Sequence, residues 1–435
     1  MNFTGKKVAV LGLGIEGKDA IQYLMSQGAA VTLLDKKPES ELDFEGVDRS
    51  KIKVFGGENY LKNLDEFDVL VRSPGVYRYL PEIVAAEDSG VAVTSAYNIF
   101  LEKCPGKIVG VTGTKGKGTT STLIYEILKA DGRDAYLSGN IGKPYLSLLQ
   151  TLTGSSWVVM ETSSFQLIDA KLSPHVAVVL NITLDHMDWH KDREEYIDAK
   201  KNIVFHQTDK DFAVINDEYE TPKSFANFTK ANVVLFSKQK LEKPYKEELL
   251  LRGEHNLENI AAAVAVAKTL GVQEEIILNT VRSFKGLEHR LELVSEVNGV
   301  AFYNDSFATG PQPTIAAINS FSEPETIILG GSDKGLDYKE LIDLIKDRQN
   351  VKNVILIGDV GQKLFGSLQE ESFKDKQIIN LKYSKMTDIV KRAFEVTPKG
   401  GVVILSPAAA SFDMFKNYKD RGNQFKAAVG SLLQK

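Results

Sequence analysis

Short apolar runs alternate with longer amphipathic segments along most of the chain. The clearest runs are Val31–Leu34, Val69–Val71, Trp157–Met160, Val176–Leu180, Phe212–Ile215, Val354–Ile357 and Val402–Leu405. A short, continuously apolar run is typical of a strand buried on both faces, and amphipathic segments between such runs are typical of covering helices. The pattern therefore predicts an α/β protein whose parallel sheets carry helices on both faces.

One local arrangement occurs three times: an apolar strand, a glycine-rich turn and the start of a helix. It spans Lys7–Gly17, Val109–Thr120 and Thr326–Gly335. Domains commonly hold about 100–200 residues. Three such units in a chain of 435 residues therefore predict three α/β domains. We place them at residues 1–95, 96–290 and 291–435.

Composition excludes several classes of protein. The hydrophobic fraction of 43% and the charged fraction of 26% are ordinary for a globular protein. A net charge of −5 argues against a nucleic-acid partner, and the single Cys104 excludes a disulfide framework. The chain starts without a signal-peptide layout, and it has no apolar stretch of the roughly 18 residues that span a bilayer. We therefore expect a cytoplasmic protein.

The segment Ile108–Ser121, IVGVTGTKGKGTTS, carries the strongest chemical signal. The loop residues Gly113, Thr114, Lys115 and Gly116 lead into a helix that starts with Lys117, Gly118 and Thr119. Backbone N–H groups of such a loop cradle phosphate, the lysine reaches the terminal phosphates, and a hydroxyl holds Mg²⁺. The match is not strict, because Val111 replaces the first glycine of the usual pattern and Gly118 follows the lysine. The Mg²⁺ ligand is Thr119 or Thr120 on this pattern.

The first strand is followed by Gly12, Gly14 and Gly17 in the spacing of a dinucleotide-binding turn. Asp35 ends the next strand, where an acidic side chain would bind a ribose hydroxyl. On these residues alone, three interpretations stay open: the turn binds NAD, it binds another nucleotide-like group, or its glycines only allow close packing of strand and helix.

Carboxylate and histidine side chains follow two central strands. Glu161 ends an apolar strand, at the edge of an open sheet where ligands bind, and is a candidate Mg²⁺ ligand. His186 and His190 have a spacing that can bind zinc, but no third ligand has an obvious spacing, so His186 beside Asp185 fits an Mg²⁺ shell or a plain loop better. By pattern alone Lys200 is an ordinary surface lysine in an amphipathic helix.

Taken in order, the motifs resemble those of the Mur ligases over nearly the whole chain. The residues that carry the resemblance are GLGIEG with Asp35, RSPGV, GTKGKGTT, SGNIG, METSSFQL, NITLDHMD, GEHNLENIAAA, GLEHRLE, YNDSFATGP, GGSDKG and LSPAAASFDMFKNYKDRGNQF. The resemblance implies Rossmann-like first and third domains around a central P-loop ATPase-type domain. It also implies an ATP-dependent amide ligase of peptidoglycan precursor synthesis, which adds D-glutamate to UDP-N-acetylmuramoyl-L-alanine through an acyl phosphate.

The resemblance also implies roles for single residues. Lys117 and Thr119 would bind ATP phosphates and metal, Glu161 and His186 would hold Mg²⁺, and a carbamylated Lys200 would bridge two ions. The loop Gly113–Gly118 would bind ATP together with Asn259, Arg290 and Asp305. The residues implied for the UDP substrate are Leu13, Gly14, Ile15, Asp35, Ser73, Gly75 and Asn140, and those for the amino acid are Thr309, Lys334, Ser411 and Tyr418.

Four departures from the family pattern bear on specificity. Phe307 stands where a lysine is usual, Gly310 replaces an asparagine, Ala409 replaces a cysteine, and Ser95–Asn98 lacks the usual acidic pair. These changes leave ATP-dependent amide formation intact but keep L-glutamate or another amino acid open as the alternative substrate. We expect small-molecule partners, no nucleic acid, no membrane span and a monomer. A NAD-dependent oxidoreductase and a non-catalytic binding protein are the alternatives from other classes.

Overall fold

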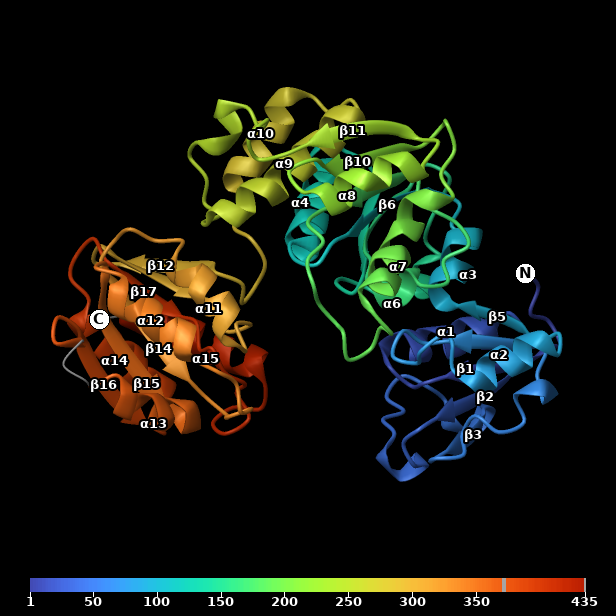
Figure 1. The fold of residues 1–435 in the computed structure, drawn as a ribbon, viewed down its shortest axis with the longest axis horizontal. Coiled ribbons are helices and arrows are strands. Elements are labelled where there is room, and N and C mark those ends of the chain that lie inside the picture. Colours follow the sequence, from blue (N-terminus) through green and yellow to red (C-terminus); the bar gives the residue numbers. More distant parts are fainter. Residues whose placement is uncertain (370–372, 434–435) are drawn as a thin grey trace. The chain divides into compact units, whose positions relative to one another are not determined.

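The computed structural model describes residues 1–369 and 373–433, which form three sheets and the helices that cover them (Figure 1). The chain divides into two compact units. The first consists of Met1–Tyr245 and Glu258–Val281, and the second of Lys246–Leu257 and Arg282–Lys435. Each apolar run predicted as a strand overlaps a strand, with Leu180 just past the end of its own, and burial of these side chains from both faces accounts for the match.

The first sheet is parallel and has the order β3-β2-β1-β4-β5. Its strands are β1 (Lys7–Leu11), β2 (Ala30–Asp35), β3 (Lys53–Gly56), β4 (Val69–Arg72) and β5 (Ala92–Ser95). Its helices are α1 (Ile15–Ser26), α2 (Pro81–Asp88) and α3 (Ala96–Lys103), with short 3₁₀ turns at Glu39–Glu41, Arg49–Lys51 and Leu64–Glu66. Alternate strand residues face opposite helices: Val8 and Val10 pack with α1 and α3, whereas Ala9 and Leu11 pack with α2.

The second sheet is also parallel and has the order β11-β10-β9-β6-β8-β7. Its strands are β6 (Lys107–Thr112), β7 (Ala135–Gly139), β8 (Trp157–Glu161), β9 (Val176–Val179), β10 (Phe212–Asn216) and β11 (Asn232–Phe236). Its helices are α4 (Lys117–Ala130), α5 (Tyr145–Leu148), α6 (Ser164–Leu167), α7 (Arg193–Phe205), α8 (Glu220–Ser224), α9 (Glu254–Thr269) and α10 (Glu274–Ser283), with 3₁₀ turns at Phe225–Phe228 and Lys243–Lys246. One apolar cluster runs through the first and second sheets, so they share a core.

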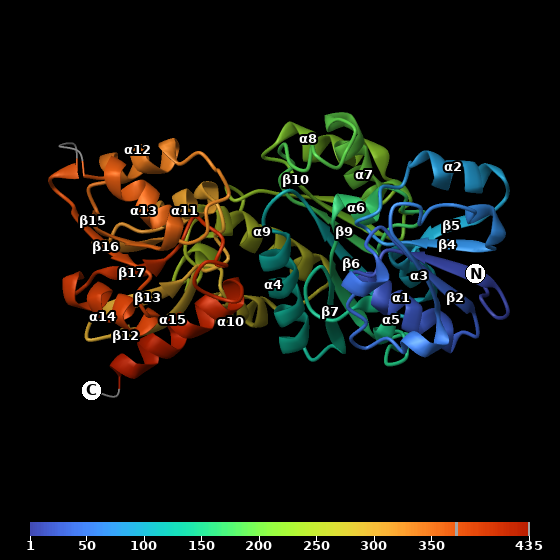
Figure 2. The same ribbon diagram turned by 90° about the horizontal axis from the view of Figure 1, so that it is seen from below.

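The third sheet has the order β12-β13-β17-β14-β15-β16. Its strands are β12 (Glu292–Val297), β13 (Val300–Asn304), β14 (Glu325–Gly330), β15 (Val351–Ile357), β16 (Gln377–Lys382) and β17 (Val402–Leu405). Figure 2 shows α11 (Pro311–Ile318), α12 (Lys339–Asp347) and α13 (Gly358–Ser367) on one face, and α14 (Met386–Val396) and α15 (Tyr418–Leu432) on the other. None of the helices within the described residues is long and apolar enough to cross a membrane.

The expectation of purely parallel sheets is wrong for one edge. Strand β12 runs antiparallel to β13. Asn298 and Gly299 join the two strands with positive φ angles of 50° and 82°. A two-residue Asn-Gly connection of this conformation matches the twist of a hairpin, and it returns the chain directly to the neighbouring strand.

Candidate active site

The phosphate loop follows β6 and is built around two glycines. Gly116 has φ 86°, and a Cβ there would lie 2.1 Å from Asn259 Oδ1. A Cβ at Gly113 would lie 2.7 Å from Leu180 Cβ. Only glycine fits both positions, so the loop passes close to β9 and α9 before the chain enters α4. The backbone N–H groups at the start of α4 then point to one place, as the phosphate interpretation requires.

Polar side chains tie this loop to its surroundings. Lys117 Nζ donates to the carbonyl oxygens of Gly113 and Thr114, each at 3.1 Å. The hydroxyl of Thr120 is buried and donates to Asn259 Oδ1 at 3.2 Å, whereas Thr119 is only partly buried. Lys115 is exposed and pairs with Asp185 at 3.2 Å. The structure thus brings Asn259 to the loop, 142 positions along the chain from Lys117.

Lys200 lies beside the same loop, and the prediction of a surface lysine from pattern alone is wrong. Its side chain is 2% exposed, and Nζ donates to Gly113 O at 2.9 Å and lies 4.8 Å from the Tyr196 ring centre. Burial, followed by the charge of Lys117, holds the pKa of Lys200 well below its usual range. The missed signal is the spacing: Tyr196, Ala199, Lys200, Ile203 and Val204 form the buried face of α7.

Glu161 ends β8 with a buried carboxylate that is 9% exposed. Its Oε2 atom is buried and has no hydrogen-bond partner in the structure. An orphaned, buried carboxylate oxygen is costly unless a cation or donor meets it, so Glu161 fits a metal ligand. Asn140 follows β7 and donates its backbone N–H to Glu161 O at 3.2 Å.

The two histidines of the central segment do not form a metal pair. His186 is exposed and has φ 55°, and His190 is buried. Both rings contact Phe165, with centroid distances of 4.8 and 5.8 Å. Among residues 1–369 and 373–433, no three His, Cys, Asp or Glu side chains converge into a metal-binding cluster. The case for a cation here therefore depends on Glu161 and the phosphate loop.

The residues expected to bind a UDP group meet at the carboxyl edge of the first sheet. Strand order changes direction between β1 and β4, which opens the crevice where doubly wound sheets bind ligands. Asp35 accepts from the N–H of Leu13 at 2.7 Å, and Ser73 Oγ donates to Gly12 O at 2.9 Å. These contacts fix the loop Gly12–Ile15 against the loop Ser73–Gly75. The exposed atoms of Gly14, Ile15 and Gly75 complete this edge.

The C-terminal unit groups most of its predicted residues at the carboxyl ends of β13 and β17. Asp305 is 8% exposed and accepts from Ser406 Oγ at 2.6 Å and from the N–H of Leu291 at 3.1 Å. Burial raises the pKa of Asp305 to about 7. Ser411 is buried, Thr309 is partly buried and Lys334 is exposed.

Phe307, the departure from the family pattern, lies between two predicted site residues. Its ring centre is 3.9 Å from the Arg290 guanidinium carbon and 5.0 Å from the ring centre of Tyr418. A guanidinium packs favourably on an aromatic face. Phe307, at the position where the family usually has a lysine, therefore orients Arg290.

A buried arginine that the sequence interpretation missed braces this part of the unit. Arg421 is fully buried and donates to Ser306 Oγ and to the carbonyl oxygens of Ser306, Ala409 and Ala410. Burial lowers the pKa of Arg421 to about 10. Its place on the buried face of α15, four and seven positions before Phe425 and Ala428, was the available signal.

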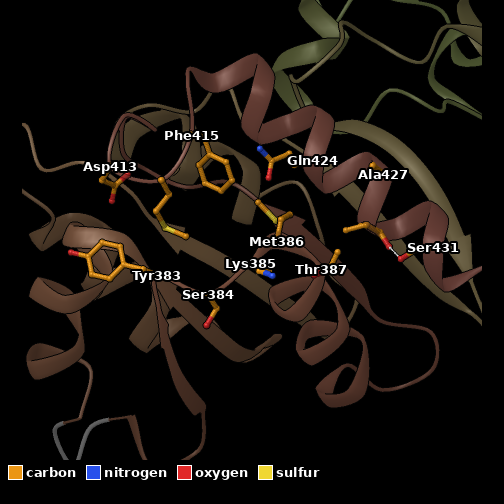
Figure 3. A pocket seen from close by; sticks show the side chains of 12 residues that line it. Tyr383, Ser384, Lys385, Met386, Thr387, Asp413, Phe415, Gln424, Ala427 and Ser431 are labelled. Carbon is orange, nitrogen blue, oxygen red and sulfur yellow. Dashed lines mark hydrogen bonds between the residues drawn. The ribbon is translucent and has the colours of Figure 1, made fainter.

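A separate cavity of about 590 Å³ lies between the segment before α14, the loop that contains Asp413 and helix α15 (Figure 3). Figure 3 shows Tyr383 and Asp413 at one end and Ser431 at the other. None of the residues predicted for ATP or the amino acid is among the described residues that line it. The cavity therefore does not mark the predicted site.

Comparison with known proteins gives consistent matches along the chain. Residues 6–95 match the Mur ligase MurD-like N-terminal domain, 111–247 the Mur ligase middle domain, and 289–409 the Mur ligase glutamate ligase domain. The UDP-N-acetylmuramoylalanine--D-glutamate ligase of Acetivibrio thermocellus is 43% identical, with 98% of this chain and 97% of the relative covered. The protein of the same name from Clostridium botulinum is 37% identical with the same coverage.

Solved structures agree in fold. The UDP-N-acetylmuramate-alanine ligase of Thermotoga maritima has a TM-score of 0.58 at 18% identity, covering 98% of this chain and 99% of that one. The MurF ligase of the same organism, solved with ADP, has a TM-score of 0.55 at 21% identity, covering 99% and 96%. With three domain matches in order and a relative 43% identical over nearly its full length, this chain belongs to the Mur ligase family.

Proposed function

We propose that this chain joins D-glutamate to UDP-N-acetylmuramoyl-L-alanine at the expense of ATP. The geometric observation that carries the proposal is the convergence of Lys117 and Lys200 on the carbonyl oxygen of Gly113, within a glycine-built phosphate loop. The match to relatives named for this reaction, at 37–43% identity over 98% of the chain, supports the choice of substrates.

The chemistry needs an activated acyl group, because a carboxylate is a poor acyl donor. The carboxylate of the UDP substrate attacks the γ-phosphorus of ATP, and the bond to ADP breaks. The resulting acyl phosphate is attacked by the amine of glutamate, which loses a proton as the tetrahedral adduct expels phosphate and leaves an amide. Lys117 releases the loop carbonyls and binds the transferring phosphoryl group, where its charge stabilises the transition state.

Mg²⁺ would be held by Glu161, with Thr119 and His186 as further ligands, and it would neutralise charge on the phosphates. The orphaned Oε2 of Glu161 supports this assignment. Because the hydroxyl of Thr120 is committed to Asn259, the structure favours Thr119 as the loop ligand. A carbamate on Lys200 would add anionic oxygens for a second ion, and a buried amine with a lowered pKa has the free electron pair that carbon dioxide needs.

The remaining roles follow the same proposal. Leu13, Gly14, Ile15, Asp35, Ser73, Gly75 and Asn140 bind the UDP substrate, Asn259, Arg290 and Asp305 bind the nucleotide of ATP, and Thr309, Lys334, Ser411 and Tyr418 bind glutamate. The domain limits at 95 and 290, the cytoplasmic location and the monomeric state stay predictions.

Phosphate release from ATP tests the reaction. We expect release with UDP-N-acetylmuramoyl-L-alanine and D-glutamate, and none without an amino acid. Release with L-glutamate alone would contradict the D-glutamate assignment and support the alternative that Phe307 and Gly310 raise. Lys117→Met should lower kcat by about a thousandfold, whereas Lys129→Met, an exposed position near the end of α4, should leave kcat unchanged.

Carbon-13-labelled bicarbonate tests the modification of Lys200. We expect a carbamate signal in the wild-type protein and in Lys201→Ala, because the amine of Lys201 pairs with Asp198 and lies over the ring of Phe228. The signal should vanish in Lys200→Ala. A signal that survives in Lys200→Ala would place the carbamate on another amine.

A further inference from the structure

His190 is a buried histidine that the proposed chemistry does not use. It is 3% exposed, and burial lowers its pKa. Nδ1 lies 3.3 Å from Glu195 Oε2, and Nε2 lies 2.9 Å from Ser164 Oγ. Because a carboxylate only accepts hydrogen bonds, Nδ1 donates to Glu195 and Nε2 accepts from Ser164.

These contacts join three of the four segments that carry the predicted metal residues, those of Glu161, His186 and Lys200. Ser164 lies three positions after Glu161, and the backbone N–H of His190 donates to His186 O at 3.0 Å. Glu195 lies on α7, five positions before Lys200. The rings of Trp189 and Tyr196 pack on the imidazole at centroid distances of 4.7 and 5.3 Å. The ring is therefore fixed in its orientation.

Glu195 also connects His190 to the first sheet. Tyr77 OH donates to Glu195 Oε1 at 2.5 Å. Tyr77 lies two positions after Gly75, on the loop expected to bind the UDP substrate. Its ring packs edge-on against Trp189 at 5.2 Å. A continuous chain of hydrogen bonds thus runs from Tyr77 through Glu195 and His190 to Ser164.

A second connection reaches the first turn of α6 from the loop Gly12–Ile15, the other loop expected to bind the UDP substrate. Glu16, which follows Ile15, accepts from Gln166 Nε2 at 2.6 Å. Gln166 Oε1 in turn accepts from the N–H and the hydroxyl of Ser163, at 2.8 and 3.1 Å. Both loops at the carboxyl edge of the first sheet are therefore tied to the two residues that open α6.

We propose that Tyr77 and His190 are positioning residues. The relay Tyr77–Glu195–His190–Ser164 holds the loop of the UDP substrate in register with the segments of Glu161, His186 and Lys200. The inference rests on the proposed function, because it concerns where the substrate carboxylate lies relative to the phosphoryl group. A misplacement of about 1 Å can cost about a hundredfold in rate. Breaking the relay should therefore lower kcat more than it weakens binding.

Three single variants and one double variant test the relay. Tyr77→Phe removes only the hydroxyl donor. His190→Gln retains a polar group that can reach Ser164 but loses the contact with Glu195. His190→Asn retains a polar group that can reach Glu195 but loses the contact with Ser164. Each single variant should lower kcat about tenfold. The KM for the UDP substrate and the KM for ATP should stay within about twofold of wild type. The double variant Tyr77→Phe with His190→Gln should also lose about tenfold, because the first break already uncouples the relay.

The control is Tyr79→Phe, an exposed tyrosine on the same loop, which should retain wild-type kcat. Thermal unfolding and calorimetric titration with the UDP substrate alone accompany each variant. A hundredfold loss in the double variant, an unchanged kcat in Tyr77→Phe, or a large loss of substrate affinity would each overturn the relay. A wild-type protein that releases no phosphate would instead overturn the proposed function.

Discussion

At the scale of single residues, the carbonyl oxygen of Gly113 accepts from two lysine amines, Lys117 at 3.1 Å and Lys200 at 2.9 Å. Two like charges that share one acceptor repel, and the charge of Lys117 contributes to the lowered pKa of Lys200. A carbamate on Lys200 would change this repulsion to attraction. The arrangement thus favours either a neutral or a modified Lys200 beside a charged Lys117.

Asp305 gives a pH dependence whose sign follows from its burial. Its pKa is about 7 in the folded protein against an ordinary 3.8. Between these values the folded chain holds a proton that the unfolded chain has released, so stability falls as pH rises through this window. Asp305→Asn, which mimics the protonated carboxyl, should remove this decline, on the order of 4 kcal/mol in the free energy of unfolding.

Urea unfolding from about pH 4 to pH 8 measures the effect. Asp333→Asn is the control. Asp333 is exposed, and hydrogen bonds from the backbone N–H of Gly335 and from the side chain of Lys363 lower its pKa, so it shifts in the opposite direction to Asp305. This variant should keep the wild-type decline. Parallel stability curves for the wild type and Asp305→Asn would show that Asp305 is not the group responsible.

Sequence alone singled out Lys117, Glu161 and Asp35 as candidates because each ends or follows a buried strand, and strand ends meet at the ligand edge of a parallel sheet. It could not show that Ser306 and Ala410 are bound by one buried arginine, Arg421, since that contact depends on how α15 packs. The burial of Lys200 was readable from helix spacing, yet a charged residue on an apolar face contradicts the usual preference of lysine for solvent.

At the scale of elements, the turn between β6 and α4 depends on backbone shape. Gly116→Ala places a Cβ against Asn259 and forces a positive φ on alanine. We expect KM for ATP to rise about tenfold or more, because the N–H groups at the start of α4 no longer converge. The backbone strain alone costs about 1–2 kcal/mol.

Gly132→Ala separates strain from loop disruption. Gly132 has a similar φ of 79°, with open space where a Cβ would lie. This variant should lose comparable stability in thermal unfolding but keep the wild-type KM for ATP. Equal KM values for the two variants would mean that the close approach to Asn259 is unimportant for binding ATP.

The hairpin β12–β13 shows how a local turn sequence determines strand direction, which the pattern of apolar runs does not reveal. The pair Asn298-Gly299 favours a two-residue turn, so the following strand pairs with its predecessor in the antiparallel sense. The strands β14 to β17 have crossover helices instead and are parallel. The apolar runs predicted the strands correctly, whereas their direction depended on the connection.

At the scale of the whole molecule, each sheet presents its predicted residues at the carboxyl ends of its strands. In the first unit these are the loops after β1 and β4 and the phosphate loop after β6. In the second unit they are Asp305 after β13 and Lys334 after β14. The order of motifs predicted this grouping within each sheet. It did not predict the contacts that join the first sheet to the second, because those contacts depend on how the two sheets pack, even where they use side chains of the motifs.

Arg72 is the main such contact. It ends β4, is fully buried, and donates to Asp169 at 2.9 Å and to the carbonyl oxygens of Phe165 and Val76 at 2.9 and 3.0 Å. Removing one member of a buried pair leaves the other charge uncompensated. Arg72→Met should therefore lower the free energy of unfolding by about 3 kcal/mol, below the upper end for such pairs because Arg78 still lies 3.4 Å from Asp169.

Urea unfolding of three variants separates the buried pair from ion pairing in general. Arg49→Met breaks an exposed pair with Glu39 and should cost less than about 1 kcal/mol. Arg72→Met combined with Asp169→Asn should be more stable than Arg72→Met alone, because no buried charge then lacks its partner. If the double variant were less stable than Arg72→Met, Asp169 would still be stabilising without Arg72, through Arg78, which lies 3.4 Å away. An uncompensated carboxylate would then not explain the loss of stability in Arg72→Met.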